Sequence, residues 1–292
     1  MSDFVERRAD LRSRRTPFVV ATVVRVQRPT SAKPGDSALV LPDGTVEGFV
    51  GGACAESTVR AQGLRLLDGG NPVILRITPA VSEETRTEGL VTVSNPCLSG
   101  GSLDIFLEPV LPPVLVRVFG DTPVARALVR LGRELGYEVD SATDADAGLP
   151  ADIGAVVVAS QGRSEEPVLA SALRAGVPYV ALVASRRRGA AVLDRLDVTP
   201  EQRARVRTPA GLDIGAQTAP EIALSVYAEL VMQRPRRAGP GKHTPMAVDP
   251  VCRMAVAINA CTPSAHCGGR SVYFCGPACR EAFIDEPARY PT

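Results

Sequence analysis

The segment VLVRVFGDTPVARALVRLGREL, residues 114–135, decides the fold class of this 292-residue chain. It opens with the short apolar run Val114–Phe119, which is typical of a strand buried on both faces of a parallel sheet. Pro123–Leu135 follows with apolar residues at helical spacing and is predicted to be a helix. A buried strand that leads directly into a helix is the repeating unit of doubly wound α/β folds.

The same alternation continues to residue 234. Strands are predicted at Ile153–Ala159 and Tyr179–Val183, and helices at Glu165–Ala175, Arg187–Leu196, Glu201–Arg205 and Pro220–Gln233. Strands that alternate with helices form parallel sheets with right-handed crossovers. Residues 113–234 are therefore predicted to form a Rossmann-like domain.

Residues 1–112 have a different pattern, which predicts an α+β domain. Strands are expected at Phe18–Gln27, Val73–Ile77 and Leu103–Glu108, and Asp43-Gly44 is predicted to turn a hairpin. Glu56–Leu67 fits a helix. The boundary to the next domain is marked by three prolines, Pro109, Pro112 and Pro113.

Composition excludes several classes of function. A net charge of +1 gives no reason to expect nucleic acid, and 4% aromatic residues without tryptophan argue against stacking platforms for bases. The first sixteen residues lack an apolar core of a signal peptide, and no apolar stretch is long enough to span a bilayer. A cytoplasmic location is therefore expected.

Residues 235–248 are rich in proline, glycine and arginine, and are predicted to be a linker.

The last forty-four residues, 249–292, are predicted to be a small metal-binding module. Five of the seven cysteines and both histidines follow residue 242. Cys275 and Cys279 would project from one face of a helix, and the distant Cys252 could add a third thiolate. Thiolates favour zinc, copper(I) or iron–sulfur chemistry. The alternatives are a redox pair or thiols that are simply buried.

Two glycine–cysteine loops stand out in the N-terminal domain. Gly51-Gly52-Ala53-Cys54-Ala55-Glu56 is read as a turn that enters a helix, where unpaired N–H groups favour an anion and lower the pKa of a thiol. Asn95–Gly101 repeats the theme with Cys97, Gly100 and Gly101. If both loops are neighbours, two thiols and several amides would converge. The residues alone leave open the alternative that the glycines make tight turns and the cysteines fill the core.

The Rossmann-like part provides weak evidence for a nucleotide. Only Gly120 of the three fingerprint glycines is present, Asp121 would repel a pyrophosphate, and Asp140 is the sole acidic candidate for a ribose. Ser185, Arg186 and Arg187 follow a strand, at the edge where such folds bind ligands, and the two arginines could hold phosphate or form a solvated helix start. Asp213 could cap a helix. With both histidines outside the two larger domains, no Ser-His-Asp triad is expected there.

Several motifs together resemble the XdhC/CoxI family over roughly residues 15–234. They are Ala32-Lys33-Pro34-Gly35, Gly51-Gly52-x-Cys54-x-Glu56, Cys97-x-Ser99-Gly100-Gly101, Val183-Ala184-Ser185-Arg186 and Pro209–Ala216. The Asn95–Gly101 loop looks closer to members linked with carbon monoxide dehydrogenases. Ala53 departs from the third glycine common in relatives.

The resemblance implies an accessory factor for molybdenum hydroxylases, a cofactor-insertion chaperone rather than an enzyme. Such a protein would bind the molybdenum cofactor (molybdopterin or its cytosine dinucleotide) transiently, support its sulfuration and deliver it to the apoenzyme. A cysteine desulfurase as sulfur donor and a homodimer are further expectations. The cofactor-binding residues so implied are Gly51, Gly52, Cys54, Glu56, Cys97, Gly100, Gly101, Ser185, Arg186, Arg187 and Asp213.

The tail resembles the YHS domain, a relative of the TRASH metal-binding modules. The matching residues are Asp249-Pro250-Val251-Cys252-x-Met254, Gly269, Tyr273-Phe274-Cys275-x3-Cys279, Phe283 and Asp285-x-Pro287-x-x-Tyr290. The resemblance implies that Cys252, Cys275 and Cys279 bind zinc or copper, with His266 as fourth ligand. Arg253 departs from the usual glycine, and the extra thiols Cys261 and Cys267 leave the fourth ligand open.

Two other functions remain as alternatives. An NAD(P)-dependent oxidoreductase would bind its nucleotide at Gly120. A metal sensor or metallochaperone would act through the tail and use the rest of the chain as a scaffold.

Overall fold

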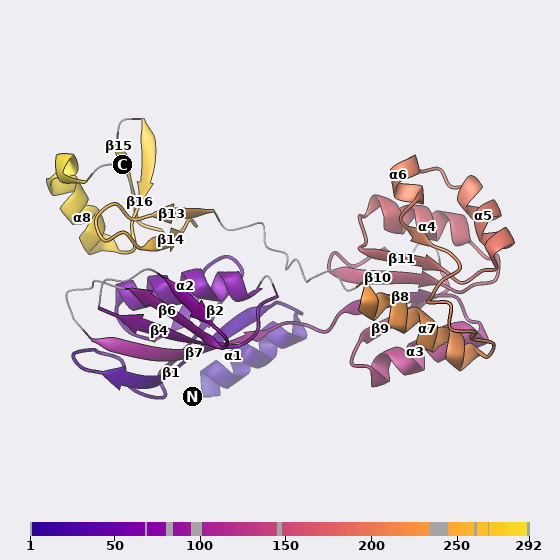
Figure 1. The fold of residues 1–292 in the computed structure, drawn as a ribbon, viewed down its shortest axis with the longest axis horizontal. Coiled ribbons are helices and arrows are strands. Elements are labelled where there is room, and N and C mark those ends of the chain that lie inside the picture. The colour runs from indigo at the N-terminus through magenta and orange to yellow at the C-terminus, as the bar shows by residue number, and fades with distance from the viewer. Residues whose placement is uncertain are drawn as a thin grey trace. The chain divides into compact units, whose positions relative to one another are not determined.

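A computed structural model describes residues 2–67, 69–79, 84–94, 101–144, 148–233, 245–259, 262–267 and 269–290 (Figure 1). The chain divides into two compact units. The first joins Met1–Pro112 to Arg237–Thr292, and the second is Pro113–Arg236. Among the residues described, no helix has both the length and the apolarity needed to cross a membrane.

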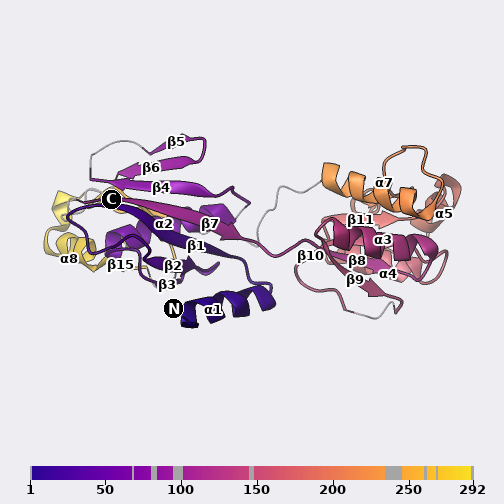
Figure 2. The ribbon, with the colours of Figure 1, turned by 90° about the horizontal axis from the view of Figure 1, so that it is seen from below.

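A mostly antiparallel sheet forms the centre of the first unit. Its strands run in the order β3-β2-β1-β7-β4-β6-β5 (Figure 2), and only the β4–β6 pair is parallel. The strands are β1 (Phe18–Gln27), β2 (Ser37–Val40), β3 (Val46–Gly48), β4 (Val73–Thr78), β5 (Thr85–Thr87), β6 (Leu90–Ser94) and β7 (Ser102–Val110).

Helix α2 (Ala53–Leu67) covers one face of this sheet. Alternate strand residues such as Val19, Leu75 and Ile105 are fully buried in the core beneath it. Helix α1 (Ser2–Ser13) packs on part of the opposite face through Leu11, against Phe18 and neighbouring strand residues. The period of two along each strand thus separates two cores.

The C-terminal module consists of two hairpins and a helix. Its elements are β13 (Met246–Val248), β14 (Ala255–Ala257), β15 (Ser264–Cys267), β16 (Arg270–Tyr273), α8 (Pro277–Asp285) and the 3₁₀ turn η1 (Pro287–Arg289). Val272, Phe274 and Phe283 form a small core of its own. Strand β13 lies within residues 235–248, the stretch predicted to be a linker. Its hydrogen bonds to β14 make these residues part of the module, which therefore begins before Asp249.

This module packs directly on helix α2 (Figure 1). Ala257 of β14 is buried in the same core as Val59 of α2. A Cβ on Gly276 would lie 3.4 Å from the Cβ of Ala53, at the start of the helix. Helix α2 is therefore covered by the sheet on one side and by the C-terminal module on the other. Its buried residues, which include polar ones, are Ala55, Ser57, Thr58, Val59, Ala61, Gln62, Gly63, Leu64, Leu66 and Leu67.

The second unit is the predicted Rossmann-like domain. Its parallel sheet has the order β12-β11-β10-β8-β9. The strands are β8 (Leu115–Phe119), β9 (Glu138–Ala142), β10 (Ile153–Val158), β11 (Tyr179–Leu182) and β12 (Val206–Arg207). The α/β fold class predicted from the sequence is confirmed.

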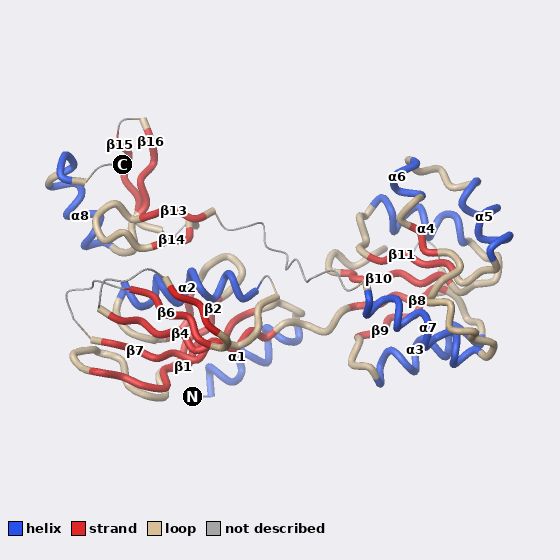
Figure 3. Tube along the Cα trace, viewed as in Figure 1, coloured by secondary structure: helices blue, strands red, loops and turns tan. Residues whose placement is uncertain are grey.

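Helices cover both faces of this sheet (Figure 3). On one face lie α3 (Pro123–Glu134) and α7 (Ala219–Met232), whose facing residues include Leu128 and Tyr227. On the other lie α4 (Glu165–Arg174), α5 (Arg186–Asp194) and the short α6 (Pro200–Arg203).

Gly132 should be needed where α3 meets α7. A Cβ at this position would collide with the hydroxyl of Tyr227, which donates a 2.9 Å hydrogen bond to the Leu128 carbonyl. Alanine normally stabilises a helix by about 1 kcal/mol over glycine. We expect the collision to outweigh that gain, so that Gly132→Ala lowers the free energy of unfolding by about 1–3 kcal/mol in urea titrations. Arg130→Ala, on the exposed side of α3, should stay within about 0.5 kcal/mol of the parent chain.

Candidate functional site

Three cysteines of the C-terminal module converge at one point. The Sγ atom of Cys275 lies 3.5 Å from those of both Cys252 and Cys279. These distances exceed the roughly 2.05 Å of a disulfide. They are close to the ~3.8 Å edge of a sulfur tetrahedron around zinc, which follows from a Zn–S bond of about 2.3 Å. The sulfurs and a carboxylate oxygen of Asp249 all lie within 4.8 Å of one another.

Asp249 holds the two cysteine-bearing segments together. It is fully buried, and its Oδ1 accepts hydrogen bonds from the backbone N–H groups of Val251 (2.8 Å) and Cys252 (3.3 Å). Its Oδ2 accepts one from the N–H of Cys275 at 2.8 Å. Each oxygen is thereby committed to the backbone. The carboxylate fixes the positions of the sulfurs instead of offering a strong ligand itself.

The thiols perturb one another. The hydrogen bond with Cys275 lowers the pKa of the Cys252 thiol. Hydrogen bonds with Cys252 and Cys54, together with burial, raise the pKa of Cys275 far above the usual range. Burial, followed by the charge of Cys252, raises the pKa of Cys279 to about 12. The three thiols therefore oppose one another's ionisation, and a cation placed among the sulfurs would favour their thiolate forms.

Cys54 lies at this cluster. Its side chain is half-buried in a group with Met254, Val256 and Cys275, and it shares a hydrogen bond with the thiol of Cys275. In the sequence, Cys54 belongs to the Gly51–Glu56 loop, which is expected to bind the molybdenum cofactor and lies far from the C-terminal cysteines along the chain. The packing of the C-terminal module on α2 brings it next to Cys275.

His266 lies elsewhere. It is on β15, exposed, with Nδ1 3.3 Å from the hydroxyl of Ser271, and it is not in the group formed with Asp249. The carboxylate of Asp249 occupies the fourth place in that group, where the resemblance implies His266. Cys267 is exposed on the same strand, and Cys261 lies outside the described residues.

The Gly51–Glu56 turn enters α2 as predicted, but the helix begins at Ala53 instead of Glu56. Gly51 is buried at φ 130°, and a Cβ there would lie 3.0 Å from that of Ala55 and 3.4 Å from the side chain of Leu103. Gly52 is exposed, with open space around it. Close packing thus accounts for the first glycine, whereas the second leaves backbone accessible.

Glu56 is engaged within its own helix. Its carboxylate accepts a 2.5 Å hydrogen bond from Arg60, which also donates to the carbonyl of Gly44 at 2.8 Å. This ties the start of α2 to the β2–β3 turn.

The second loop can be followed only at its end. Cys97 and Gly100 lie outside the described residues. Gly101 is described, and a Cβ on it would collide with the carbonyl of Pro29. Since Gly51 contacts Leu103, the end of this loop and the first glycine turn meet at the same end of the sheet.

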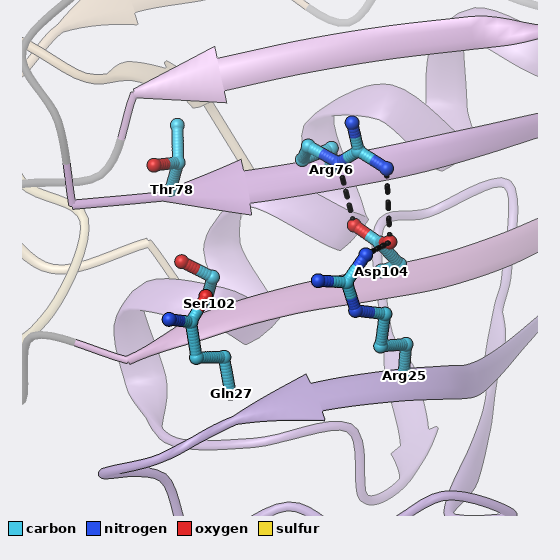
Figure 4. A pocket seen from close by; sticks show the side chains of 6 residues that line it. All are labelled: Arg25, Gln27, Arg76, Thr78, Ser102 and Asp104. Carbon is cyan, nitrogen blue, oxygen red and sulfur yellow. Dashed lines mark hydrogen bonds and ion pairs between the residues drawn. The ribbon is translucent and has the colours of Figure 1, made fainter.

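A polar pocket of about 240 Å³ lies at that end, on the sheet face opposite α2 (Figure 4). Asp104 is nearly buried there and accepts two hydrogen bonds from Arg76, at 2.8 and 3.1 Å. Arg25 lies 3.7 Å from the same carboxylate. Two guanidinium groups against one carboxylate leave a net positive charge. The pocket is lined by Arg25, Gln27, Arg76, Thr78, Ser102 and Asp104.

Sequence reasoning missed this pocket. Arg25 faces Asp104 because a bulge between Val23 and Arg25 shifts the register of β1 against β7. Without the bulge the period of two would direct Arg25 into the core under α2. The sequence did contain one signal for this pocket: Asp104 alternates with the apolar Leu103 and Ile105, which places the carboxylate on the opposite face of the sheet from the core.

In the second unit, the loop after β11 is exposed at residues 185–187. Ser185 caps α5 by accepting a hydrogen bond from the N–H of Arg188 at 3.3 Å. Arg186 and Asp213 come within 3.6 Å, both almost fully exposed, and Arg187 is exposed as well. Two candidate residues far apart in sequence are thus neighbours here, and their weak ion pair leaves the guanidinium accessible.

The turn after β8, where a nucleotide would be expected, makes several contacts within its own domain. A Cβ on Gly120 would lie 2.5 Å from the carbonyl of Ala159, so this glycine permits close packing of β8 on β10. Asp121 pairs with Arg126 at 2.8 Å. Asp140, the candidate for a ribose, accepts hydrogen bonds at 2.8 and 2.5 Å from the buried Arg117. Gly120 and Asp121 thus make contacts within the domain, and one oxygen of Asp140 is already paired with Arg117.

Two family models match the chain. One is described as the XdhC and CoxI family and matches residues 11–78, and the other as the XdhC Rossmann domain and matches residues 116–230. Together they cover more than half of the chain.

Among curated proteins, the chain is similar to the uncharacterized protein YqeB of Escherichia coli (strain K12), with 27% identity over 259 residues. The match covers 79% of this chain but only 46% of YqeB, so the chain spans about half the length of this relative. A solved structure described as a xanthine dehydrogenase from Bacillus halodurans is 17% identical, with a TM-score of 0.38. That match covers 78% of this chain and 95% of the other.

Asp249→Ala should unfold the cysteine cluster locally. It removes the acceptor of three backbone N–H groups, each of which costs about 1–3 kcal/mol when buried without a partner. Hydrogen exchange of residues 249–256 and 270–276 should accelerate strongly, while the Rossmann-like unit keeps its protection. Asp285→Ala, at an exposed position of α8, is the matched control and should leave exchange unchanged. Slow exchange in Asp249→Ala would contradict the role given to this carboxylate.

Proposed function

Since the chain belongs to the XdhC and CoxI family, we propose that it is an accessory factor for a molybdenum hydroxylase of the xanthine or carbon monoxide dehydrogenase type. In this role it binds the molybdenum cofactor, assists its sulfuration and delivers it to the apoenzyme. The cofactor supplies the redox and oxygen-transfer chemistry of the client enzyme, and this chain supplies binding and protection. A cysteine desulfurase is the proposed sulfur donor, and the chain is proposed to act as a homodimer.

The observation that carries this proposal is the positive pocket of Arg25 and Arg76. Molybdopterin and its cytosine dinucleotide are anionic phosphate esters, and paired guanidinium groups are suited to phosphate. Thr78 and Ser102 add hydroxyl donors at the same place. At about 240 Å³ the pocket is below the roughly 300–1,000 Å³ of sites that enclose a whole small molecule. We therefore assign it the phosphate end of the cofactor alone.

The glycine–cysteine loops would hold the rest of the cofactor. Gly52 leaves its backbone accessible beside the N-terminus of α2, where an anion is favoured. Cys54 and Cys97 are the proposed sulfur contacts to molybdenum, and Gly100 and Gly101 the proposed backbone contacts. In the second unit, the exposed side chains of Arg186 and Arg187, near Ser185 and Asp213, are proposed to bind phosphate.

Arg25→Gln should weaken cofactor binding without disturbing the fold. Arg25 is largely exposed, and its only described ion pair is the 3.7 Å contact with Asp104. Loss of a charge-assisted hydrogen bond to phosphate costs about 1.5–3 kcal/mol, which corresponds to roughly tenfold weaker binding or more. Protein purified from a host that makes molybdopterin should retain correspondingly less pterin fluorescence and molybdenum.

Arg12→Gln removes the same charge from an exposed position of α1 and serves as the control. It should retain as much pterin as the parent chain. Equal retention by Arg25→Gln and the parent would remove the pocket from the proposal, and absence of pterin from the parent chain would refute cofactor binding altogether.

We propose a second function for the C-terminal module, the binding of zinc or copper. The convergence of the Cys252, Cys275 and Cys279 sulfurs at spacings suited to a soft metal supports it. Cys252→Ser should abolish the stoichiometric metal, about one ion per chain, in elemental analysis of purified protein. Cys267→Ser, which alters an exposed thiol of the same module, should keep it. Equal metal contents in the two variants would contradict the assignment.

A further inference from the structure

The three sulfurs of the C-terminal module leave one corner of a tetrahedral site to be filled. Structural sites for zinc and similar metals use four protein ligands. Three residues are candidates for the fourth ligand: Asp249, His266 and Cys54. Which residue completes the site is a question that rests on the proposed metal-binding function.

Asp249 is the least suited, although its carboxylate is close. Both oxygens accept hydrogen bonds from backbone N–H groups, and these bonds hold the loops of Cys252 and Cys275 in place. Turning an oxygen towards a metal would break at least one of them inside a fully buried environment.

His266 would require a larger change. It is exposed on β15 and is paired across the hairpin with Ser271, which contacts its ring nitrogen. Bringing it to the sulfurs would disrupt the β15–β16 pairing. Cys267, the next residue, is exposed on the same strand.

Like His266, Cys54 is not in the group formed with Asp249, but it already contacts a member of that group, Cys275. It already shares a hydrogen bond with Cys275 and packs with Met254 and Val256 beside Cys252 and Cys279. Three further contacts hold the module against α2 and the neighbouring β2–β3 turn. Ala257 is buried in the core shared with Val59, the side chain of Asn259 lies against Gly44, and Gly276 faces Ala53.

We propose that Cys54 is the fourth ligand, so that one soft metal ion is bound by four thiolates, Cys54, Cys252, Cys275 and Cys279. The metal then joins the N-terminus of α2 to the C-terminal module. On binding, each thiol that carries a proton releases it to solvent, and no oxidant or reductant is needed. A sulfur committed to this metal is not available to molybdenum, so the two ions compete for Cys54.

Cobalt(II) titration of the full-length metal-free chain tests the ligand set. The sulfur-to-cobalt absorption should indicate four thiolates in the parent chain and fall by about a quarter in Cys54→Ser, with metal affinity weakened by about 100-fold or more. His266→Ala and Cys267→Ser should match the parent in both respects. X-ray absorption spectroscopy of the zinc-bound protein should correspondingly show four sulfur ligands in the parent chain and three in Cys54→Ser.

Hydrogen exchange tests the link between the two parts. Removing the metal with a chelator should accelerate exchange at the start of α2, residues 53–58, in the parent chain. In Cys54→Ser and Cys54→Ala the same residues should respond weakly, while residues 249–256 and 270–279 still respond. Comparison of the metal-free forms by exchange shows whether either substitution alters the fold.

The outcomes separate this inference from the function on which it rests. Absence of metal from the parent chain, with a Cys54–Cys275 disulfide found by mass spectrometry, would overturn both. Metal bound by Cys252, Cys275 and Cys279 with unchanged spectra in Cys54→Ser, or with a loss in His266→Ala, would overturn only the role of Cys54.

Discussion

The burial of helix α2 on two opposite sides is the constraint on which the first unit depends. The helix carries small, apolar or uncharged residues around most of its circumference, and a helix of this kind is stable only when covered all round. The seven-stranded sheet covers one side, and β14 with Ala257 contributes to the other. The C-terminal module in turn has only the small core around Phe274, too little for about forty-four residues to fold alone. Each part therefore supplies apolar surface that the other lacks.

How far the sequence predicts this fold depends on where each element lies. The strands β8, β10 and β11 are central in a parallel sheet, so their apolar runs reveal them. Strand β9 is at an edge and has the mixed sequence EVDSA, which carries no such signal. The short β5 is fully exposed, and α1 buries Leu11 but otherwise presents mostly charged residues. These elements are stabilised by packing and pairing with neighbouring elements, and the local sequence pattern does not contain that information.

The candidate sites divide in the same way. The spacing of Cys275 and Cys279, together with a distant Cys252, predicted three neighbouring sulfurs, because a helical turn brings the first two to one face. The approach of Cys54 depends on the packing of β14 against α2, a contact between segments nearly two hundred residues apart along the chain. The pocket of Arg25 and Arg76 depends on one bulge that reverses the facing of Arg25. Whether Cys97 joins Cys54 lies outside the described residues, so the predicted meeting of these two thiols stays a prediction.

A thiol shared between two proposed ligands has a thermodynamic consequence. If the metal in the C-terminal module and the molybdenum cofactor both use Cys54, each weakens the binding of the other by the same factor, because coupling between two ligands is reciprocal. The metal-bound form would hold the module at the start of α2, where Gly276 lies against Ala53. Withdrawal of Cys54 would leave three sulfurs around the metal and a thiol at the positive end of α2, where a thiolate is favoured. Occupancy of the module by its metal would thus set the availability of the residue that the cofactor needs.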